Sequence, residues 1–302
     1  TYTGTGSNQT ISNTFQSDMI WVKGRNYAYN HSIQDAVRGF SANKVIYPNL
    51  TNVEGHYSDT GYIQSVASNN FVVGTGTHSD DANYNDNGST YVAWNWKANG
   101  ASPAITYAVK VVSDSGNKYR FDDFGTSAVT LDLQEGGTYT FDQSDSSNSG
   151  HPLRFSTTSN GSHGGGSEYT TGVTTNGTPG SSGAYTRITV AASAPTLYYY
   201  CTNHSAMGGQ ANTNSTFGSS NFSGAIQTAV SANTTAGFSI VSWTGTGSNS
   251  TIGHGLGAVP QMILSKSTGH GENWAVYHHK SNATPEDYYL ALDDTRVASD
   301  SN

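Results

Sequence analysis

The chain has 302 residues, enough for two or three domains; 11% of them are charged and 34% are hydrophobic. The formal net charge is −8 without a basic cluster, which argues against a nucleic-acid partner, because phosphates need a concentrated positive patch. No apolar run has the roughly 18 residues of a membrane-spanning helix, and the single Cys excludes an intrachain disulfide.

The apolar residues are mostly those that favour strands, and Gly, Ser, Asn and Asp interrupt them about every eight to twelve positions. We therefore predict an all-β, multi-domain protein. Residues 1–103 form the first expected module, a β-sandwich or jelly roll. Its predicted strands are residues 19–22, 45–47, 71–73 and 91–96, and residues 31–38 are a candidate for one or two helical turns.

Residues 104–214 are expected to form a second β domain. Its predicted strands are residues 107–112, 129–133, 139–141, 151–155, 188–190 and 197–201. The segment between residues 157 and 184 is rich in Gly, Ser and Thr, so it lacks the apolar groups that offset the entropy of ordering a chain. We expect it to be a surface loop ordered mainly by contacts with neighbouring subunits.

A possible ligand set for a metal lies in this domain. Cys201 is followed by His204 and Met207, and His151 lies fifty residues upstream. Side chains alternate faces along a strand, so if Leu197 and Tyr199 face a core, Cys201 faces it too. By the same rule, Leu153 and Phe155 of the other strand place His151 on the core side. Two His, one Cys and a weak axial Met are the ligands of a blue-copper site.

These residues resemble the motif of the cupredoxins, in which an upstream His precedes Cys-x-x-His and a Met in the last loop. The resemblance covers about residues 104–214. It implies a Greek-key sandwich and copper as cofactor, with His151, Cys201, His204 and Met207 as metal ligands. One departure is that Gly208-Gly-Gln-Ala-Asn-Thr213 follows the Met, where cupredoxins have an apolar final strand. Two alternatives stay open: a lone Cys that packs as a small hydrophobe, and a copper-protein fold that has lost its metal.

Residues 215–235 are expected to be a connector with one strand or short helix at residues 225–230, and residues 236–302 a second copy of the first module. Thr3-Gly-Thr-Gly-Ser-Asn8 recurs as Thr244-Gly-Thr-Gly-Ser-Asn249, and Met19-Ile-Trp-Val-Lys23 matches Met262-Ile-Leu-Ser-Lys266. Each copy also has a Tyr close to a His, at residues 29–31 in the first and 277–278 in the second. Such long-period self-similarity marks repeat arrays. The first copy lacks an entry strand and the second lacks the strand at residues 91–96, so we expect both ends to lie within a longer polypeptide.

Other chemical candidates are weaker. His163-Gly-Gly-Gly166 resembles an oxyanion-hole sequence, but no Gly-x-Ser-x-Gly elbow accompanies it, so we expect a loop and a non-enzymatic protein. The histidines of the last module lack Cys or carboxylate partners at ligand spacing. They are His254, His270, His278 and His279. The acidic pairs at residues 80–81, 122–123 and 293–294 lie in turn-like sequences that solvation or Asx turns explain.

The flanking modules resemble repeats of long structural and tail-fibre-type proteins of marine phages, especially cyanophages, which carry cupredoxin-like domains. The resemblance implies a structural or adhesive virion protein at the virion surface, outside the cell. It implies self-association as a homo-oligomer, such as a trimer or fibre, and host attachment through a surface glycan or receptor. The alternatives are a cell-surface electron carrier with type 1 copper and a glycan-binding module, since jelly rolls with exposed Trp and Tyr commonly bind sugars.

Overall fold

The computed structural model describes residues 1–77, 83–98, 102–214, 216–296 and 298–300. Its fold is all-β: strands form several separate sheets, and the helices are short 3-10 turns within these ranges. The same ranges contain no helix with the length and apolarity needed to cross a membrane. Two compact units result, one of residues 1–98, 234–238 and 256–302, the other of residues 99–233 and 239–255.

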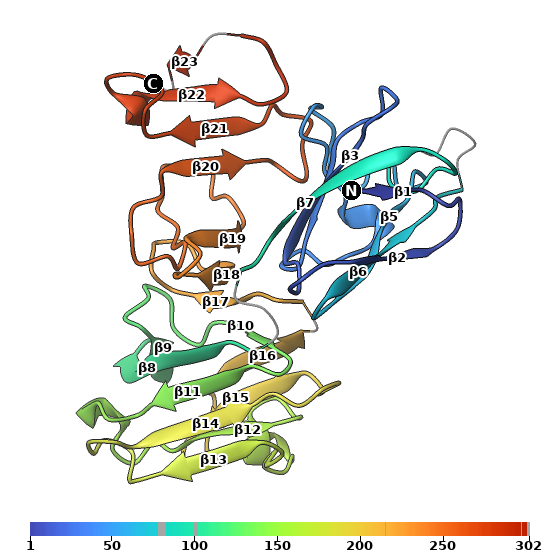
Figure 1. The fold of residues 1–302 in the computed structure, drawn as a ribbon. Helices are drawn as coiled ribbons and strands as arrows, with labels where there is room; N and C mark the ends of the chain where they lie inside the picture. Colours follow the sequence, from blue (N-terminus) through green and yellow to red (C-terminus); the bar gives the residue numbers. More distant parts are fainter. Residues whose placement is uncertain (78–82, 99–101, 215, 297, 301–302) are drawn as a thin grey trace. The chain divides into compact units, whose positions relative to one another are not determined.

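The first unit holds a sandwich of two sheets with strand orders β1-β7-β3-β4 and β2-β6-β5 (Figure 1). Their elements are β1 (Tyr2–Thr3), β2 (Gln9–Ser12), β3 (Met19–Gly24), β4 (Ser32–Asp35), η1 (Ala42–Lys44), β5 (Tyr62–Ala67), β6 (Asn70–Gly74) and β7 (Thr90–Trp96). Alternate residues of β3, Ile20 and Val22, are fully buried and pack with Phe71 and Tyr91 in the core. The candidate helical turn at residues 31–38 is wrong, because Ser32 to Asp35 pair with β3 as a strand.

A further sheet of this unit has the order β20-β21-β22-β23. Its elements are β20 (Met262–Ser265), β21 (Ala275–His278), η4 (Pro285–Asp287), β22 (Tyr288–Ala291) and β23 (Ser299–Asp300). Trp274 is buried with Ile33 and Ile46, and its indole N–H donates to the carbonyl of Tyr47 at 2.9 Å. Residues 256–302 therefore pack in one compact unit with residues 1–98, whereas the sequence predicted a separate domain.

The architecture is repeat-like, and the two copies agree in their hydrogen bonds. β20 pairs with β21 from Met262–His278 to Ser265–Ala275, as β3 pairs with β4 from Met19–Asp35 to Val22–Ser32. Lys23 donates to the carbonyls one and four residues ahead, Gly24 and Tyr27, and Lys266 does the same with Ser267 and His270. The part that the two copies share is therefore a pair of antiparallel strands together with the turn that follows the first of them.

This register corrects one detail of the predicted repeat. The backbone N–H of His31 donates to Asn49 Oδ1, and the N–H of Trp274 donates to Asp293 Oδ1 in the same way. His31 therefore corresponds to Trp274, which precedes β21, while Tyr277 and His278 lie inside that strand. The Tyr-and-His similarity between residues 29–31 and 277–278 does not mark equivalent positions.

The second unit is a β-sandwich with sheets β10-β16-β15-β12 and β13-β14-β11-β8-β9 (Figure 1). Its elements are β8 (Ala104–Ser113), β9 (Asn117–Phe121), β10 (Leu131–Gln134), β11 (Thr138–Asp142), η2 (Ser146–Asn148), β12 (Leu153–Ser156), η3 (Gly161–Gly164), β13 (Val173–Asn176), β14 (Tyr185–Thr189), β15 (Leu197–Cys201), β16 (Gly209–Asn214), β17 (Ser219–Asn221) and β18 (Thr228–Asn233); β19 (Phe238–Ser242) continues a third sheet, β17-β18-β19. Buried aromatic residues from both large sheets fill one core, among them Tyr107, Phe121, Phe141, Phe155 and Tyr199.

The predicted connector at residues 215–235 contains a strand that overlaps the predicted one, β18, but the segment belongs to the core of the second unit. It contains β17 and β18, and Phe222 is buried against Tyr107 in the core of the second unit. The hydroxyls of Tyr107 and Tyr139 bond to the Ser220 carbonyl and the Ser219 hydroxyl. Burial of two Tyr hydroxyls requires such partners, because an unpaired buried polar group is destabilising.

The segment of residues 157–184 also differs from the prediction, because its own backbone bonds order it within this unit. Tyr169 N–H donates to the Phe155 carbonyl at 2.7 Å, Gly180 N–H donates to the Gln143 carbonyl at 2.8 Å, and β13 pairs with β14. Backbone hydrogen bonds do not depend on side-chain type, so a Gly- and Ser-rich sequence forms them as well as an apolar one.

The residues after Met207 form a strand despite their polarity. β16 pairs with both β15 and β10, so it is a central strand of its sheet. A Cβ at Gly208 would lie 1.7 Å from the backbone oxygen of Tyr199, and one at Gly209 would lie 2.6 Å from the oxygen of Ala128. The two glycines are therefore required by the close approach of neighbouring backbones.

We expect Gly208→Ala to destabilise the second unit by about 2–3 kcal/mol, because the added methyl group forces the backbone of β15 or β16 to move. The matched control is Gly125→Ala in the same unit, where the added Cβ meets nothing within 4 Å; its effect should stay within about 0.5 kcal/mol. Differential scanning calorimetry measures both. Equal effects of the two substitutions would contradict the close approach at Gly208.

Candidate metal centre

The candidate site lies where β12 and β15 meet at one end of the sandwich. Cys201 is the last residue of β15 and is paired with Leu153, the first residue of β12. His151 lies two residues before Leu153. Leu197, Tyr199, Cys201, Leu153 and Phe155 are all buried, as strand alternation predicted. Pairing of β12 with β15 therefore brings the Cys201 thiol close to the segment that carries the His151 imidazole, although the two residues are fifty positions apart in the sequence.

The structure brings three of the four predicted ligands into one group. The Cys201 Sγ lies 3.8 Å from His151 Nδ1 and 3.7 Å from His204 Nδ1. The ligand atoms of all three lie within 4.8 Å of one another, and the imidazole rings are 4.5 Å apart. One ion with metal–sulfur and metal–nitrogen bonds of about 2.3 and 2.0 Å in trigonal or tetrahedral geometry separates S and N by roughly 3.5–3.8 Å. The spacing therefore fits a single shared ion.

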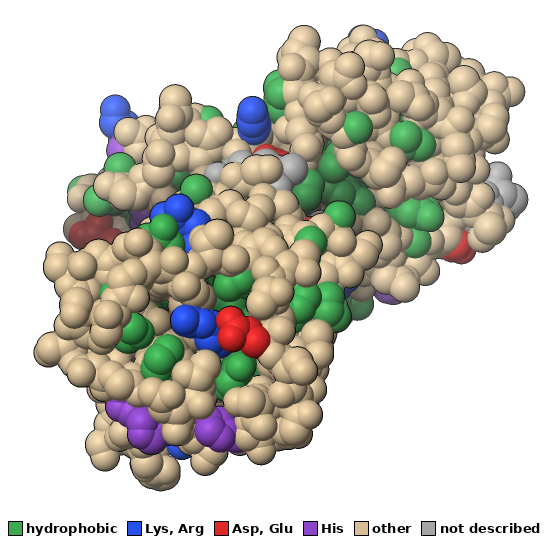
Figure 2. All heavy atoms as spheres, turned by 90° about the horizontal axis from the view of Figure 1, so that it is seen from below, with side chains coloured by type: hydrophobic (Ala, Val, Ile, Leu, Met, Phe, Trp, Pro, Cys, Tyr) green, Lys and Arg blue, Asp and Glu red, His purple; other side chains and the backbone are tan. Residues whose placement is uncertain are grey.

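The three side chains differ in their access to solvent. Cys201 is buried, His151 is half-buried and His204 is exposed. Histidines gather on one part of the surface in the view of Figure 2, on a face where charged side chains are sparse. Burial, and then the neighbouring His204, lower the pKa of His151. The neutral imidazole that a metal requires is thereby favoured over the charged form.

The backbone of His151 is held by residues for which the sequence contained no signal. The Tyr119 hydroxyl donates to the His151 carbonyl at 2.9 Å, and the Gln143 side-chain amide donates to it at 2.8 Å. Burial, and then the nearby Cys201, raise the pKa of Tyr119, so its phenol stays protonated as a donor. The Gln143 amide oxygen in turn accepts from Leu153 N–H. Outer contacts of this kind orient a ligand residue before a metal arrives.

The loop after Cys201 is tied to the His151 segment. The side-chain amide of Asn203 donates to the Gly150 carbonyl at 2.9 Å, and Thr202 N–H donates to the Pro152 carbonyl. Asn160 accepts from Ala206 N–H at 2.7 Å. His204 thus lies within a loop that is hydrogen-bonded on both sides of it. Asn203 lies inside the Cys-x-x-His motif, so the motif could have pointed to it.

Met207, the predicted axial ligand, is buried in the same core as Cys201 and Tyr119. Its carbonyl accepts a hydrogen bond from Tyr119 N–H at 2.9 Å, which connects it to the strand that supports His151. The chain therefore re-enters the core of the sandwich at Met207, after the short loop that follows Cys201. Met207 is thus placed in the core cluster that also contains Cys201.

The other candidate residues have structural partners. His163 lies in η3, and its Nε2 is 3.1 Å from the Cys201 carbonyl, so the His-Gly-Gly-Gly sequence packs beside the candidate site. Asp122 accepts from Ala108 N–H, Asp123 pairs with Lys110, and Asp293 accepts from Trp274 N–H. Rings of His278 and His279 lie 5.0 Å apart on the last module. The acidic pair at residues 80–81 lies outside the described residues.

A family model for a domain of unknown function, DUF7483, matches residues 1–120 and 202–302. Comparison with curated proteins and with solved structures finds no match. The matched ranges include His204 and Met207 and leave out His151 and Cys201, so membership of the family carries no statement about a metal. Because the matched ranges make up more than half of its residues, the chain belongs to the DUF7483 family.

Proposed function

We propose that the second unit binds one copper ion through His151, Cys201 and His204, with Met207 as a weak axial ligand. The observation that carries this proposal is the group of one sulfur and two nitrogen atoms, with S–N separations of 3.8 and 3.7 Å. A thiolate with two imidazoles favours copper over harder cations, and copper is the strongest binder of the common divalent ions at such ligands. When bound, copper supplies one-electron chemistry.

We further propose that the chain serves as a structural or adhesive component of a virion surface and self-associates as a homo-oligomer. Its modules are repeat-like, and the two copies pack through corresponding faces, since Trp21 and Leu264 contact the same cluster around Trp274. Modules that gain stability by packing on copies of themselves are typical of extended arrays. The similarity to marine-phage repeats suggests host attachment, through a surface glycan or receptor, as the purpose of the array.

Electron transfer is the second candidate, and the exposure of His204 favours it. A buried Cys201 shields the site from water, while an exposed imidazole on the same ion offers a partner protein a short path to the metal. Reversible one-electron voltammetry of the copper-loaded chain, with exchange to a soluble partner, would support this role. A copper ion that cannot be reduced reversibly would favour the structural role.

The test of the copper proposal is titration of the intact chain with Cu(II), followed by visible absorption and electron paramagnetic resonance. One equivalent should produce the intense absorption of a Cu–thiolate bond. The His204→Ala variant should bind copper more than about tenfold more weakly, because removing even a residue that only hydrogen-bonds to a metal ligand lowers metal affinity by 10–100-fold. Because His204 is exposed, its removal should change the metal-free stability by less than about 0.5 kcal/mol. Absence of that absorption at one equivalent, or unchanged affinity in the variant, would contradict the proposal.

A further inference from the structure

A short turn between β12 and β13, residues 160–166, packs against the end of β15, and we call it the clamp turn. It contains η3, and Gly166 N–H donates to the Gly161 carbonyl at 3.0 Å. Gly161 has a φ of +54°, and a Cβ there would lie 2.4 Å from the ring of Tyr200, the residue before Cys201. Only glycine permits this approach. The backbone of the clamp turn therefore rests directly on the strand that carries Cys201.

Two side chains of the clamp turn reach the loop of residues 201–207. His163 Nε2 lies 3.1 Å from the Cys201 carbonyl oxygen, and Asn160 Oδ1 accepts from Ala206 N–H at 2.7 Å. A carbonyl oxygen only accepts, so His163 Nε2 carries the hydrogen of its bond. The two bonds hold the loop on either side of His204.

The bond from Ala206 supports an unusual backbone conformation. Ala206 has a φ of +57°, in the left-handed region that residues other than Gly, Asn and Asp rarely adopt. Such a conformation persists only where surrounding contacts fix it. Ala206 directly precedes Met207, the residue at which the loop re-enters the core. Asn160 therefore supports the position where the direction of the loop is decided.

The side chain of Asn160 is used for the loop and not for its own helix. Asn160 occupies the N-cap position of η3, where Asn commonly accepts from the helix backbone. Among the described residues, its side chain bonds to Ala206 and makes no such cap. Its own φ of +61° is one that Asn adopts readily. The conformation of Asn160 thus directs its amide oxygen to the neighbouring loop.

The clamp turn is itself anchored to β12. The Ser156 hydroxyl donates to the Ser167 carbonyl at 2.8 Å, and Tyr169 N–H donates to the Phe155 carbonyl at 2.7 Å. β12 begins two residues after His151. The clamp turn therefore connects the strand next to one imidazole with the loop that carries the other.

We propose that Asn160 and His163 are positioning residues, which hold the loop of residues 201–207 in the conformation for copper binding before the ion arrives. This inference rests on the proposed copper site, and it adds the residues that set the affinity and geometry of that site. His163 acts through the Cys201 carbonyl, and Asn160 acts through the Ala206 amide. A loop that is already ordered loses less conformational freedom when it binds an ion, so the ion binds more tightly.

The test compares variants that remove each hydrogen bond with variants that keep it. Asn160→Gly removes the acceptor but allows the left-handed backbone, whereas Asn160→Asp keeps an acceptor oxygen. His163→Ala removes the donor, whereas His163→Gln keeps an N–H donor on a side chain of similar reach. Ser159→Ala, at an exposed position beside the clamp turn, is the control.

Two measurements on the full chain read out the loop and the site. In the metal-free chain, hydrogen exchange of residues 202–206 should be at least about fivefold faster in Asn160→Gly and His163→Ala, because the loop opens more often. Copper titration against a competing chelator should show about tenfold weaker binding in these two variants, with a shifted Cu–thiolate absorption. Asn160→Asp, His163→Gln and Ser159→Ala should keep the exchange, the affinity and the absorption of the unaltered chain.

The outcomes separate this inference from the copper proposal. Unchanged exchange and affinity in Asn160→Gly and His163→Ala, in a chain that binds copper, would overturn the positioning role alone. Failure of His163→Gln to keep the affinity would also overturn it, because the imidazole itself would then be needed. So would an affinity that falls only in proportion to a lowered unfolding midpoint, since the effect would then be one of folding. Absence of the Cu–thiolate absorption in the unaltered chain would overturn both proposals.

Discussion

The Cys201→Ser variant should lose the visible absorption of the copper-loaded chain and bind copper more than about a hundredfold more weakly. Losing an outer-shell partner of a ligand already lowers affinity by 10–100-fold, so losing the thiolate itself should exceed that range. Cys201 is the chain's single Cys, which leaves no other thiolate to replace it. Copper titration followed by absorption measures the effect.

The matched control is Ser205→Ala, because Ser205 lies in the same loop and is exposed. It should keep both the absorption and the affinity. The same pair of variants tests the alternative in which Cys201 is only a core residue. In that case Cys201→Ser would lower stability, by about 1–3 kcal/mol for a buried hydroxyl without a partner, and copper affinity would be equally weak in both variants.

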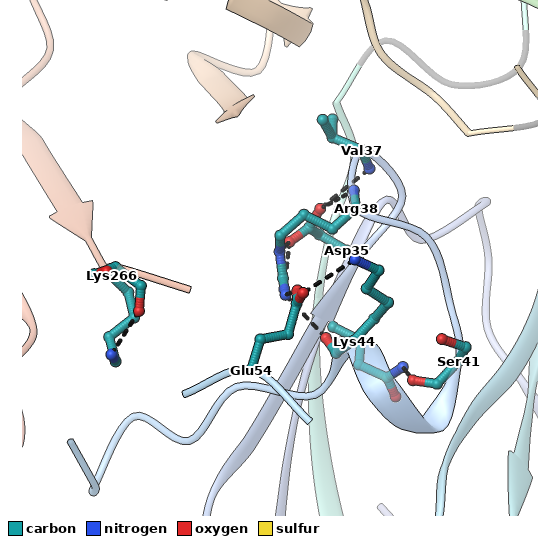
Figure 3. Close-up of polar contacts among 9 residues, drawn as sticks. Asp35, Val37, Arg38, Ser41, Lys44, Glu54 and Lys266 are labelled. Atoms are coloured by element: carbon teal, nitrogen blue, oxygen red, sulfur yellow. Dashed lines mark hydrogen bonds and ion pairs between the residues drawn. The ribbon is translucent and has the colours of Figure 1, made fainter. Parts of the chain in front are cut away.

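The Arg38→Met variant should lower the stability of the first unit by about 3–5 kcal/mol, the typical effect of removing one partner of a buried ion pair. The Arg38 guanidinium pairs with Asp35 at 2.6 Å and with Glu54 (Figure 3), and the three side chains are 11%, 6% and 14% exposed. Burial alone would lower the pKa of Arg38, but the charges of Asp35 and Glu54 outweigh it and raise the pKa. Removing Arg38 leaves two carboxylates without their main cation.

Lys44→Met is the matched control for this network. Lys44 pairs with the other oxygen of Glu54 at 3.0 Å, but its side chain is 41% exposed, so its loss should lower stability by no more than about 1 kcal/mol. Figure 3 shows Lys266 apart from this network, bonded to the chain near its own position. Calorimetry of the first unit's transition separates the two variants. An Arg38→Met effect as small as that of Lys44→Met would contradict a buried network.

The fold class and the repeat were predictable because both depend on local patterns. Alternation of apolar and polar residues, with turns between them, predicts strands whatever the tertiary structure is. The Thr-Gly-Thr-Gly-Ser-Asn and Met-Ile motifs marked the repeat by identity alone. Helical turns at residues 31–38 were a wrong candidate because Ser32 and Gln34 are buried on one face of β4. Pairing with β3 overrode the local preference.

The sequence by itself determined the ligand types of the candidate site: a single Cys, a His three residues later and a His beside an apolar strand supply one sulfur and two imidazoles. Tertiary structure alone decided that they converge, because the pairing of Leu153 with Cys201 joins segments fifty residues apart. It also decided their support, since Tyr119 of β9 and Gln143, the residue after β11, both donate to the His151 carbonyl. Contacts between distant segments depend on sheet order and register, which alternation along one strand does not encode.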